Sequence, residues 1–143
     1  MSRTQMPDTA QVPDPVNAPA HYTGHPSGVE CIEIIEHMSF CLGNAIKYLF
    51  RHAGKGNALQ DLKKAIWYIR REGHNPGLPV RPDSARTSAF RRYMEFEQHS
   101  DIKSAMRLIW LVGSGIADID NLETARWYIE LEIERREKCG GER

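Results

Sequence analysis

The chain has 143 residues and a mass of 16.3 kDa, enough for one compact domain around a single hydrophobic core. Apolar residues make up 41% and charged residues 27% of the sequence, a balance that excludes wholesale disorder. Nineteen basic and nineteen acidic side chains give a net charge of zero, so a role in coating nucleic acid, which needs a basic excess, is not expected. Three cysteines without a CxxC spacing favour a reducing compartment over a disulfide framework or a zinc site.

Residues 1–20 contain four prolines and almost no large apolar side chain, so we expect an extended or disordered arm there. This segment lacks the apolar stretch of a secretory signal. No apolar run in the chain approaches the roughly 20 residues that a membrane span requires. We therefore expect a cytoplasmic protein with no membrane partner and with a single helical domain over residues 21–143.

Beyond the arm, apolar residues recur mostly at the spacing of a helix. A loop rich in proline and glycine interrupts this pattern over residues 73–84. Alternating strand patterns are scarce, so the predicted fold class is all-α. The predicted helices cover residues 28–40, 42–53, 59–72, 85–98, 101–112 and 119–138.

An internal repeat supports a helical bundle. A shift of 60 residues aligns residues 42–72 with residues 102–132 without a gap, and five identical pairs fall within the pattern L-x-x-A-x-W-Y-I. A lone helical hairpin cannot bury its apolar stripe, so we expect two related hairpins, residues 42–72 and 102–138, to pair into a four-helix core. The N-terminal helix then packs beside this core. The alternative is that two unrelated hairpins merely look alike.

Charge is distributed unevenly along the chain. Residues 44–72 hold seven basic and two acidic side chains, a net +5, whereas residues 117–137 hold three basic and seven acidic ones, a net −4. One interpretation is that solvated helix faces compensate one another, and the other is that the basic segment meets an anionic ligand. Most polar residues of the first copy are lost in the second. Ligand chemistry is therefore expected on the first hairpin.

A polar row on the first hairpin carries the main functional hypothesis. Asn44, Lys47 and Arg51 are spaced i, i+3, i+7, which places them together on the side of the helix opposite its apolar stripe. An amide, a point charge and a forked guanidinium suit phosphate oxygens. The turn over residues 54–57 adds Lys55 and backbone N–H groups that can form an anion nest. The alternative is an ordinary exposed helix face.

Further candidates flank this row. Asp61 and Lys64 share a face of the following helix, and Glu30 stands near the start of the first one, where it can bind a divalent cation or act as a base. His21 and Tyr22 precede that helix in a loop from which they can contact a base or sugar, although Tyr22 can equally cap the core. The P-loop and the GxGxxG signatures are absent, so any phosphate binding uses another scaffold.

Several blocks of the sequence resemble a small family from tailed phages that is often described as a domain of unknown function or as nucleotide kinase-like. The blocks are PAHY (19–22), GVECIEIIE (28–36), LGNAIKYLFR (42–51), KG (55–56) and DLKKAIWYI (61–69). The resemblance implies a small helical protein in the host-cell cytoplasm. Through one branch of the family, it also implies phosphorylation of deoxynucleoside monophosphates, with ATP or another nucleoside triphosphate as donor and Mg²⁺ as a candidate cofactor.

The first hypothesis is therefore a phage-encoded deoxynucleoside monophosphate kinase with a nucleotide as substrate. The proposed catalytic residues are Lys47, Arg51, Glu30 and Asp61, and the proposed substrate-binding residues are His21, Tyr22, Asn44, Lys55 and Lys64. A non-enzymatic protein that sequesters a nucleotide through the same basic face is one alternative. A helical assembly protein whose charged faces are subunit contacts is another.

A third alternative comes from a weaker similarity to all-α nucleoside triphosphate pyrophosphohydrolases, which use paired E-x-x-E and E-x-x-D metal motifs. E-x-x-E occurs at Glu30–Glu33, but Asp61 is followed three residues later by Lys64, where an acid is needed. A homo-oligomer is also expected, because a helical bundle with three tryptophans leaves apolar area for a symmetric partner. By helical phase, Trp67 lies away from the apolar stripe, where a subunit contact, base stacking or simple exposure would explain it.

Overall fold

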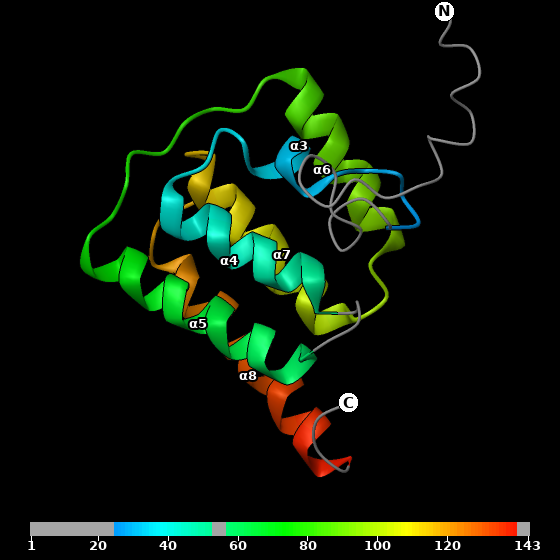
Figure 1. The fold of residues 1–143 in the computed structure, drawn as a ribbon. Coiled ribbons are helices and arrows are strands. Elements are labelled where there is room, and N and C mark those ends of the chain that lie inside the picture. The colour runs from blue at the N-terminus through cyan, green and yellow to red at the C-terminus, as the bar shows by residue number, and fades with distance from the viewer. Residues whose placement is uncertain (1–24, 53–56, 140–143) are drawn as a thin grey trace, which may run out of the picture.

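The structure is a computed structural model that describes residues 25–52 and 57–139, and these fold into a bundle of helices (Figure 1). No strand occurs among the described residues, so the all-α prediction is confirmed. Within the described ranges, none of the helices is both long enough and apolar enough to cross a membrane. The predicted arm of residues 1–20 lies outside the described residues. The helices are α3 (Cys31–Ile35), α4 (Phe40–Arg51), α5 (Ala58–His74), α6 (Ser84–Phe96), α7 (Ser100–Gly113) and α8 (Asn121–Lys138).

Two helical hairpins form the centre of the bundle. Helix α4 packs against α5 and α7 packs against α8, while α5 also contacts α8 and α4 contacts α7 (Figure 1). Helices α3 and α6 pack on one another beside this core. Helix α4 begins at Phe40 and α7 at Ser100, which is the offset of the sequence repeat. The same repeat positions are buried in both hairpins, as in the pairs Ala45/Ala105, Leu49/Ile109, Leu62/Leu122, Ala65/Ala125 and Ile69/Ile129.

The predicted helix over residues 28–40 is wrong in its extent. Gly28 has a φ of 78°, a left-handed conformation outside the helix, and α3 covers only Cys31–Ile35. The chain then leaves the helical conformation because Ser39 is the N-cap of α4. Ser39 has extended backbone, and its Oγ accepts a hydrogen bond from the backbone N–H of Leu42 at 3.3 Å. The two signals, a glycine before α3 and a serine before α4, are readable in the sequence.

The three tryptophans fall into two classes. Trp110 is buried in α7, stacks on Phe90 and donates from Nε1 to the backbone oxygen of Ile34 at 3.1 Å. Trp67 on α5 and Trp127 on α8 are 58% and 53% exposed and occupy equivalent repeat positions. The prediction that Trp67 lies away from the apolar stripe is therefore confirmed, and a homo-oligomer remains a prediction for which these two side chains are the candidates.

Candidate functional site

The two predicted polar rows meet around the ring of Tyr48. The Nζ atoms of Lys47 and Lys64 lie 4.7 and 5.3 Å from the centre of this ring, and Cζ of Arg51 lies 5.5 Å from it. Helix α4 supplies Lys47, Tyr48 and Arg51, and its hairpin partner α5 supplies Lys64. Attraction between each cation and the ring offsets part of the repulsion among the three charges. We call these four residues the cation face, and their combined positive potential suits an anion.

Asp61 stands beside the cation face. Its Oδ2 lies 3.9 Å from Nε of Arg51, and its side chain is only 7% exposed, against 32% for Arg51. Asp61 lies in the first turn of α5, where the helix dipole stabilises a negative charge. A separation of 3.9 Å is an ion pair rather than a hydrogen bond, so Asp61 orients the guanidinium through its charge. This placement suits a positioning residue better than a catalytic base.

Asn44 and Glu30 both take part in local hydrogen bonds. The Nδ2 of Asn44 donates to the backbone oxygen of Phe40 at 2.8 Å, one turn earlier in α4. Glu30 is the N-cap of α3, and its backbone N–H donates to Oε2 of Glu33 at 3.0 Å within a capping box. Helix capping therefore accounts for the position of Glu30 without any ligand, and its predicted catalytic role stays a prediction.

Lys47 is also within electrostatic range of α3. Burial raises the pKa of the Cys31 thiol, at the start of α3, to about 12, and the charge of Lys47 acts against that rise. Lys47 lies one turn after Gly43, and Gly43 faces Ile35 of α3, so Lys47 stands on the side of α4 toward α3.

Three predicted binding residues, His21, Tyr22 and Lys55, lie outside the described residues. Lys55 belongs in sequence to the short segment that joins α4, which ends at Arg51, to α5, which begins at Ala58. The predictions for these three side chains stay predictions.

An aromatic cluster adjoins the cation face and was missed by the sequence analysis. The rings of Tyr48 and Tyr68 stack at 5.9 Å with an angle of 13° between their planes. Phe40 and Trp67 each meet Tyr68 edge-on, at 6.1 and 5.0 Å. Phe40 is 75% exposed, which is unusual for so large an apolar side chain. The signal was the spacing of four between Phe40, Asn44 and Tyr48, which puts two aromatic residues on the side of α4 that carries the polar row.

A second polar cluster lies where α4 ends and α6 meets α7. Nε2 of His52 is 3.4 Å from both carboxylate oxygens of Glu97, and Nδ1 of His99 is 3.2 Å from one of them. His52 and Glu97 are buried, and the possible ligand atoms of the three residues lie within 4.8 Å of one another. Two imidazoles and one carboxylate are a donor set that transition metals accept.

The hydrogen bonds of His52 argue against a metal in this cluster. Nη2 of Arg136 lies 2.8 Å from Nδ1 of His52. A guanidinium can only donate, so Nδ1 accepts, and the proton of the neutral ring sits on Nε2 and faces Glu97. To bind a metal through Nε2, His52 would need an unprotonated Nε2 and a proton on Nδ1 that is donated to an acceptor. Arg136 offers no acceptor to Nδ1. The cluster is therefore built as a hydrogen-bond network.

The network holds the carboxylate of Glu97 ionised. Burial alone would raise the pKa of Glu97, but interactions with His52, a hydrogen bond from the backbone N–H of His99 and one from the hydroxyl of Tyr93 lower it to about 2. Burial of the Tyr93 side chain raises the pKa of its hydroxyl, and the neighbouring carboxylate of Glu97 raises it further. The Tyr93 hydroxyl donates to Oε1 of Glu97 at 2.8 Å. This cluster ties α4, α6 and α8 together rather than presenting groups to a ligand.

The acidic surplus of residues 117–137 is partly used within the fold. Nε of Arg136 donates a hydrogen bond to the buried carboxylate of Glu132 at 2.7 Å. The guanidinium of Arg135 donates hydrogen bonds to the carboxylates of Glu132 and Asp101. Lys63 of the first hairpin lies 3.6 Å from Glu137 of α8. Charge compensation between the hairpins thus involves Lys63, while Lys47, Arg51 and Lys64 gather around Tyr48 instead.

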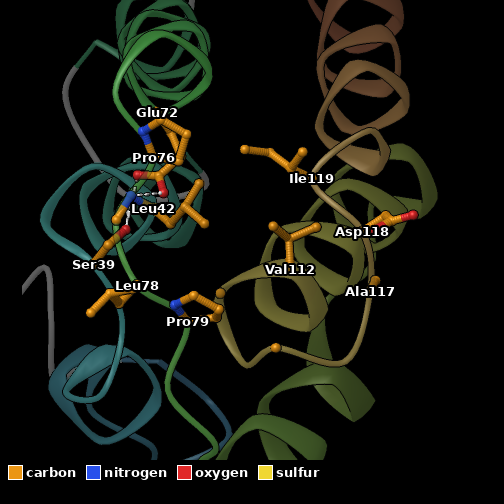
Figure 2. A pocket seen from close by; sticks show the side chains of 13 residues that line it. Ser39, Leu42, Glu72, Pro76, Leu78, Pro79, Val112, Ala117, Asp118 and Ile119 are labelled. Atoms are coloured by element: carbon orange, nitrogen blue, oxygen red, sulfur yellow. Dashed lines mark hydrogen bonds between the residues drawn. The ribbon is translucent and has the colours of Figure 1, made fainter.

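A cavity of about 390 Å³ lies at one end of the two hairpins (Figure 2), and no residue of the cation face lines it. Its walls are largely apolar, with Leu42, Val112 and Ile119 among them. The buried carboxylate of Glu72 stands at one side and accepts hydrogen bonds from Ser39 Oγ at 2.9 Å and from the backbone N–H of a loop glycine at 2.8 Å. Among the described residues, no lysine or arginine lines this cavity, so it does not suit a phosphate.

Comparison with known proteins locates one family in the chain. Residues 16–70 match the family model described as "Protein of unknown function (DUF3310)". The chain carries a DUF3310 domain over this segment. No curated protein and no solved structure matches the chain. The matched segment contains α3, α4 and most of α5, and therefore the whole cation face. It also contains every site residue predicted from the sequence. The description of the family assigns no chemistry to it.

Proposed function

We propose that this protein is a phage-encoded nucleotide-processing enzyme that transfers a phosphoryl group to a deoxynucleoside monophosphate on the cation face. The observation that carries the proposal is the convergence of Lys47, Arg51 and Lys64 on the ring of Tyr48. Three cations from two helices can contact several phosphate oxygens at once, and a guanidinium can do so with two parallel hydrogen bonds. The half-buried ring of Tyr48 provides an apolar floor against which these contacts are made.

Phosphoryl transfer requires little covalent chemistry from a protein. Most of the rate enhancement comes from holding donor and acceptor in line and from neutralising charge on the transferred group. Lys47 and Lys64, as mobile point charges, are suited to follow that charge as it moves. Arg51, oriented by Asp61, is suited to hold one phosphate in a fixed position.

The described carboxylates fit a magnesium cage poorly. Asp61 is paired with Arg51, the carboxylate of Glu33 accepts from the backbone of Glu30, and Glu36 accepts from Nη1 of Arg86 at 2.8 Å. Mg²⁺ is commonly held by one or two carboxylates together with substrate phosphates. We therefore propose that any Mg²⁺ the reaction uses arrives on the phosphates of ATP or of another nucleoside triphosphate. The same contacts weigh against the pyrophosphohydrolase alternative, which needs Glu30, Glu33 and Glu36 as ligands.

The motif evidence points the same way. The block L-G-N-A-I-K-Y-L-F-R, which includes Lys47, Tyr48 and Arg51, is one of the blocks that resemble the nucleotide kinase-like phage family. The DUF3310 match covers that block and the segment that supplies Lys64. Sequence resemblance and geometry thus support the same surface as the reaction site.

A turnover screen tests the proposal. Each deoxynucleoside monophosphate is incubated with ATP, with and without Mg²⁺, and the products are separated by chromatography. We expect a deoxynucleoside diphosphate to form with at least one acceptor, and Lys47→Ala and Arg51→Ala to abolish its formation while circular dichroism shows unchanged helicity. Arg107→Ala is the matched control, because Arg107 is the exposed counterpart of Lys47 in the second hairpin and should keep full activity. Full activity in both cation-face variants would overturn the proposal.

The other hypotheses predict different products in the same screen. Tight nucleotide binding with an unchanged ligand would favour a protein that sequesters nucleotides through the same face. Release of pyrophosphate would favour a hydrolase. Failure to bind any nucleotide would leave a helical assembly protein.

A further inference from the structure

We propose that a hollow between α3 and α4 holds the base of the nucleotide whose phosphates bind the cation face. The inference rests on the proposed function and adds to it a subsite for the base. The hollow measures about 210 Å³ and is open to the surface. Its apolar lining comes from Ile32, Ile35, Met38, Phe40 and Gly43, and its polar lining from Glu36, Ser39 and Asn44. The carboxylate of Glu36 accepts a hydrogen bond from Arg86.

The lining has the chemistry of a base subsite. Ile32 and Phe40 are 53% and 75% exposed, so two large apolar side chains stand at the surface of the hollow where a planar ring can pack on them. Small-molecule sites are mostly apolar with a few placed polar groups. Asn44 supplies such a group: its bond to the Phe40 carbonyl uses one of its two N–H donors, and the amide also has an accepting oxygen.

Gly43 lets the backbone of α4 stand close to α3 at the edge of the hollow. A Cβ built at this position would lie 3.8 Å from Ile35, at ordinary van der Waals distance. The wall of the hollow at Gly43 is therefore formed by backbone atoms.

The hollow continues into the cation face along a single helix. Asn44 lies one turn before Tyr48, and Arg51 lies one further turn along the same side of α4. With a rise of 1.5 Å per residue, the side chains of Asn44 and Arg51 are about 10 Å apart along the axis. Lys47 stands between them along the axis, one turn after Gly43, which faces Ile35 of α3. A nucleotide with its base over Asn44 can therefore extend its phosphates toward Lys47 and Arg51.

The competing position for the base is the aromatic cluster, which Phe40 joins through its contact with Tyr68. There Tyr68 and the exposed Trp67 offer ring faces and edges. The hollow is favoured because it is concave and contains an amide that can hydrogen-bond to a base edge. The two positions make opposite predictions for substitutions at Ile32 and at Trp67.

The test compares a nucleotide with a ligand that has phosphates but no base. Binding of ATP, of each deoxynucleoside monophosphate and of inorganic tripolyphosphate is measured by calorimetry on the full chain. Ile32→Ser and Phe40→Ala should each weaken the binding of the preferred nucleotide about tenfold and leave tripolyphosphate binding unchanged, because only the base loses its packing partner. Ile116→Ser is the control for removing an exposed apolar side chain, since Ile116 is as exposed as Ile32 and lies in the turn of the second hairpin.

Each other outcome is decisive. If Ile32→Ser and Phe40→Ala leave nucleotide binding unchanged, or weaken tripolyphosphate equally, the hollow is not the base subsite, although the cation face still binds phosphate. If Trp67→Ala weakens nucleotide binding while Ile32→Ser does not, the base lies on the aromatic cluster and the hollow proposal is overturned. If the wild-type protein binds neither nucleotide nor tripolyphosphate, the proposed function itself fails.

Discussion

The buried carboxylate of Glu97 offers a direct test of how the fold is held together. Glu97 follows α6 and accepts hydrogen bonds from the hydroxyl of Tyr93 and the backbone N–H of His99, while its carboxylate faces the ring of His52. The substitution Glu97→Gln keeps the size of the side chain but removes the charge that these donors stabilise. Its amide group also places two hydrogens among groups that already donate.

The size of the effect follows from the pKa. The hydrogen-bond donors outweigh burial and lower the pKa of Glu97 from the ordinary value of 4.5 to about 2 in the folded protein. Because the folded pKa is the lower one, the ionised carboxylate stabilises the fold above pH 4.5, and that contribution is lost as the pH falls toward 2. The difference corresponds to about 3 kcal/mol at neutral pH. We therefore expect Glu97→Gln to lower the free energy of unfolding by up to about 3 kcal/mol at pH 7.

Urea unfolding followed by circular dichroism at pH 7, 4 and 2.5 measures this difference. The gap between wild type and Glu97→Gln should narrow steadily below pH 4.5. Glu95→Gln, an exposed change on the same helix, is the control and should stay close to wild type at each pH. The reasoning would be refuted by a Glu97→Gln variant as stable as wild type at pH 7, or by a gap that does not change with pH.

Three further predictions concern packing, reactivity and assembly. Gly77→Ala should lower the free energy of unfolding in urea by about 1–3 kcal/mol, because the new Cβ would lie 2.6 Å from the Cβ of Ser39. Unchanged stability would show that the loop can shift to make room. In the folded protein, a thiol reagent should modify the exposed Cys139 and spare the buried Cys31, whose pKa is raised by burial to about 12. Cys31 should react only after urea unfolds the chain, and equal modification rates of the two thiols in the folded protein would contradict this. Replacing the exposed Trp67 and Trp127 by Ser should shift an oligomer toward monomer in light scattering; a wild-type protein that is already monomeric would remove the expectation.

Periodicity was sufficient to predict the helical core. The apolar stripe of Ala45 and Leu49 in α4 and its counterpart of Ala105 and Ile109 in α7 are buried as the spacing required. The helix ends were harder, because they depend on local hydrogen bonds rather than on burial. The first helix was drawn too long since its apolar pattern runs on toward α4, while the capping hydrogen bond of Ser39 decides where one helix stops and the next begins.

The sequence named the cations of the candidate site, Lys64 included, but it predicted their arrangement only within one helix. The spacing of Asn44, Lys47 and Arg51 placed them on one side of α4, as helical geometry requires. The approach of Lys64 to the same ring depends on how α5 packs on α4, which spacing along the chain does not encode, and the central place of Tyr48 follows from that packing.

The buried network around His52 and Glu97 was out of reach for a similar reason. The two residues are 45 positions apart, and Arg136, which fixes the ring proton of His52, is 84 positions away from it. Neither separation leaves a local pattern in the sequence. Such long-range contacts become visible only in the fold.

The most direct test of the central claim compares two neighbouring lysines on α5. Lys64 approaches the ring of Tyr48, whereas Lys63 lies 3.6 Å from Glu137 of α8. ATP binding is measured by calorimetry for Lys64→Ala, Lys63→Ala and Lys47→Ala. The account predicts about tenfold or greater weakening for Lys64→Ala and Lys47→Ala, because each loses a charge-assisted contact to phosphate, and wild-type affinity for Lys63→Ala. Equal affinity in all three variants, or equal loss in all three, would show that no shared phosphate site exists around Tyr48.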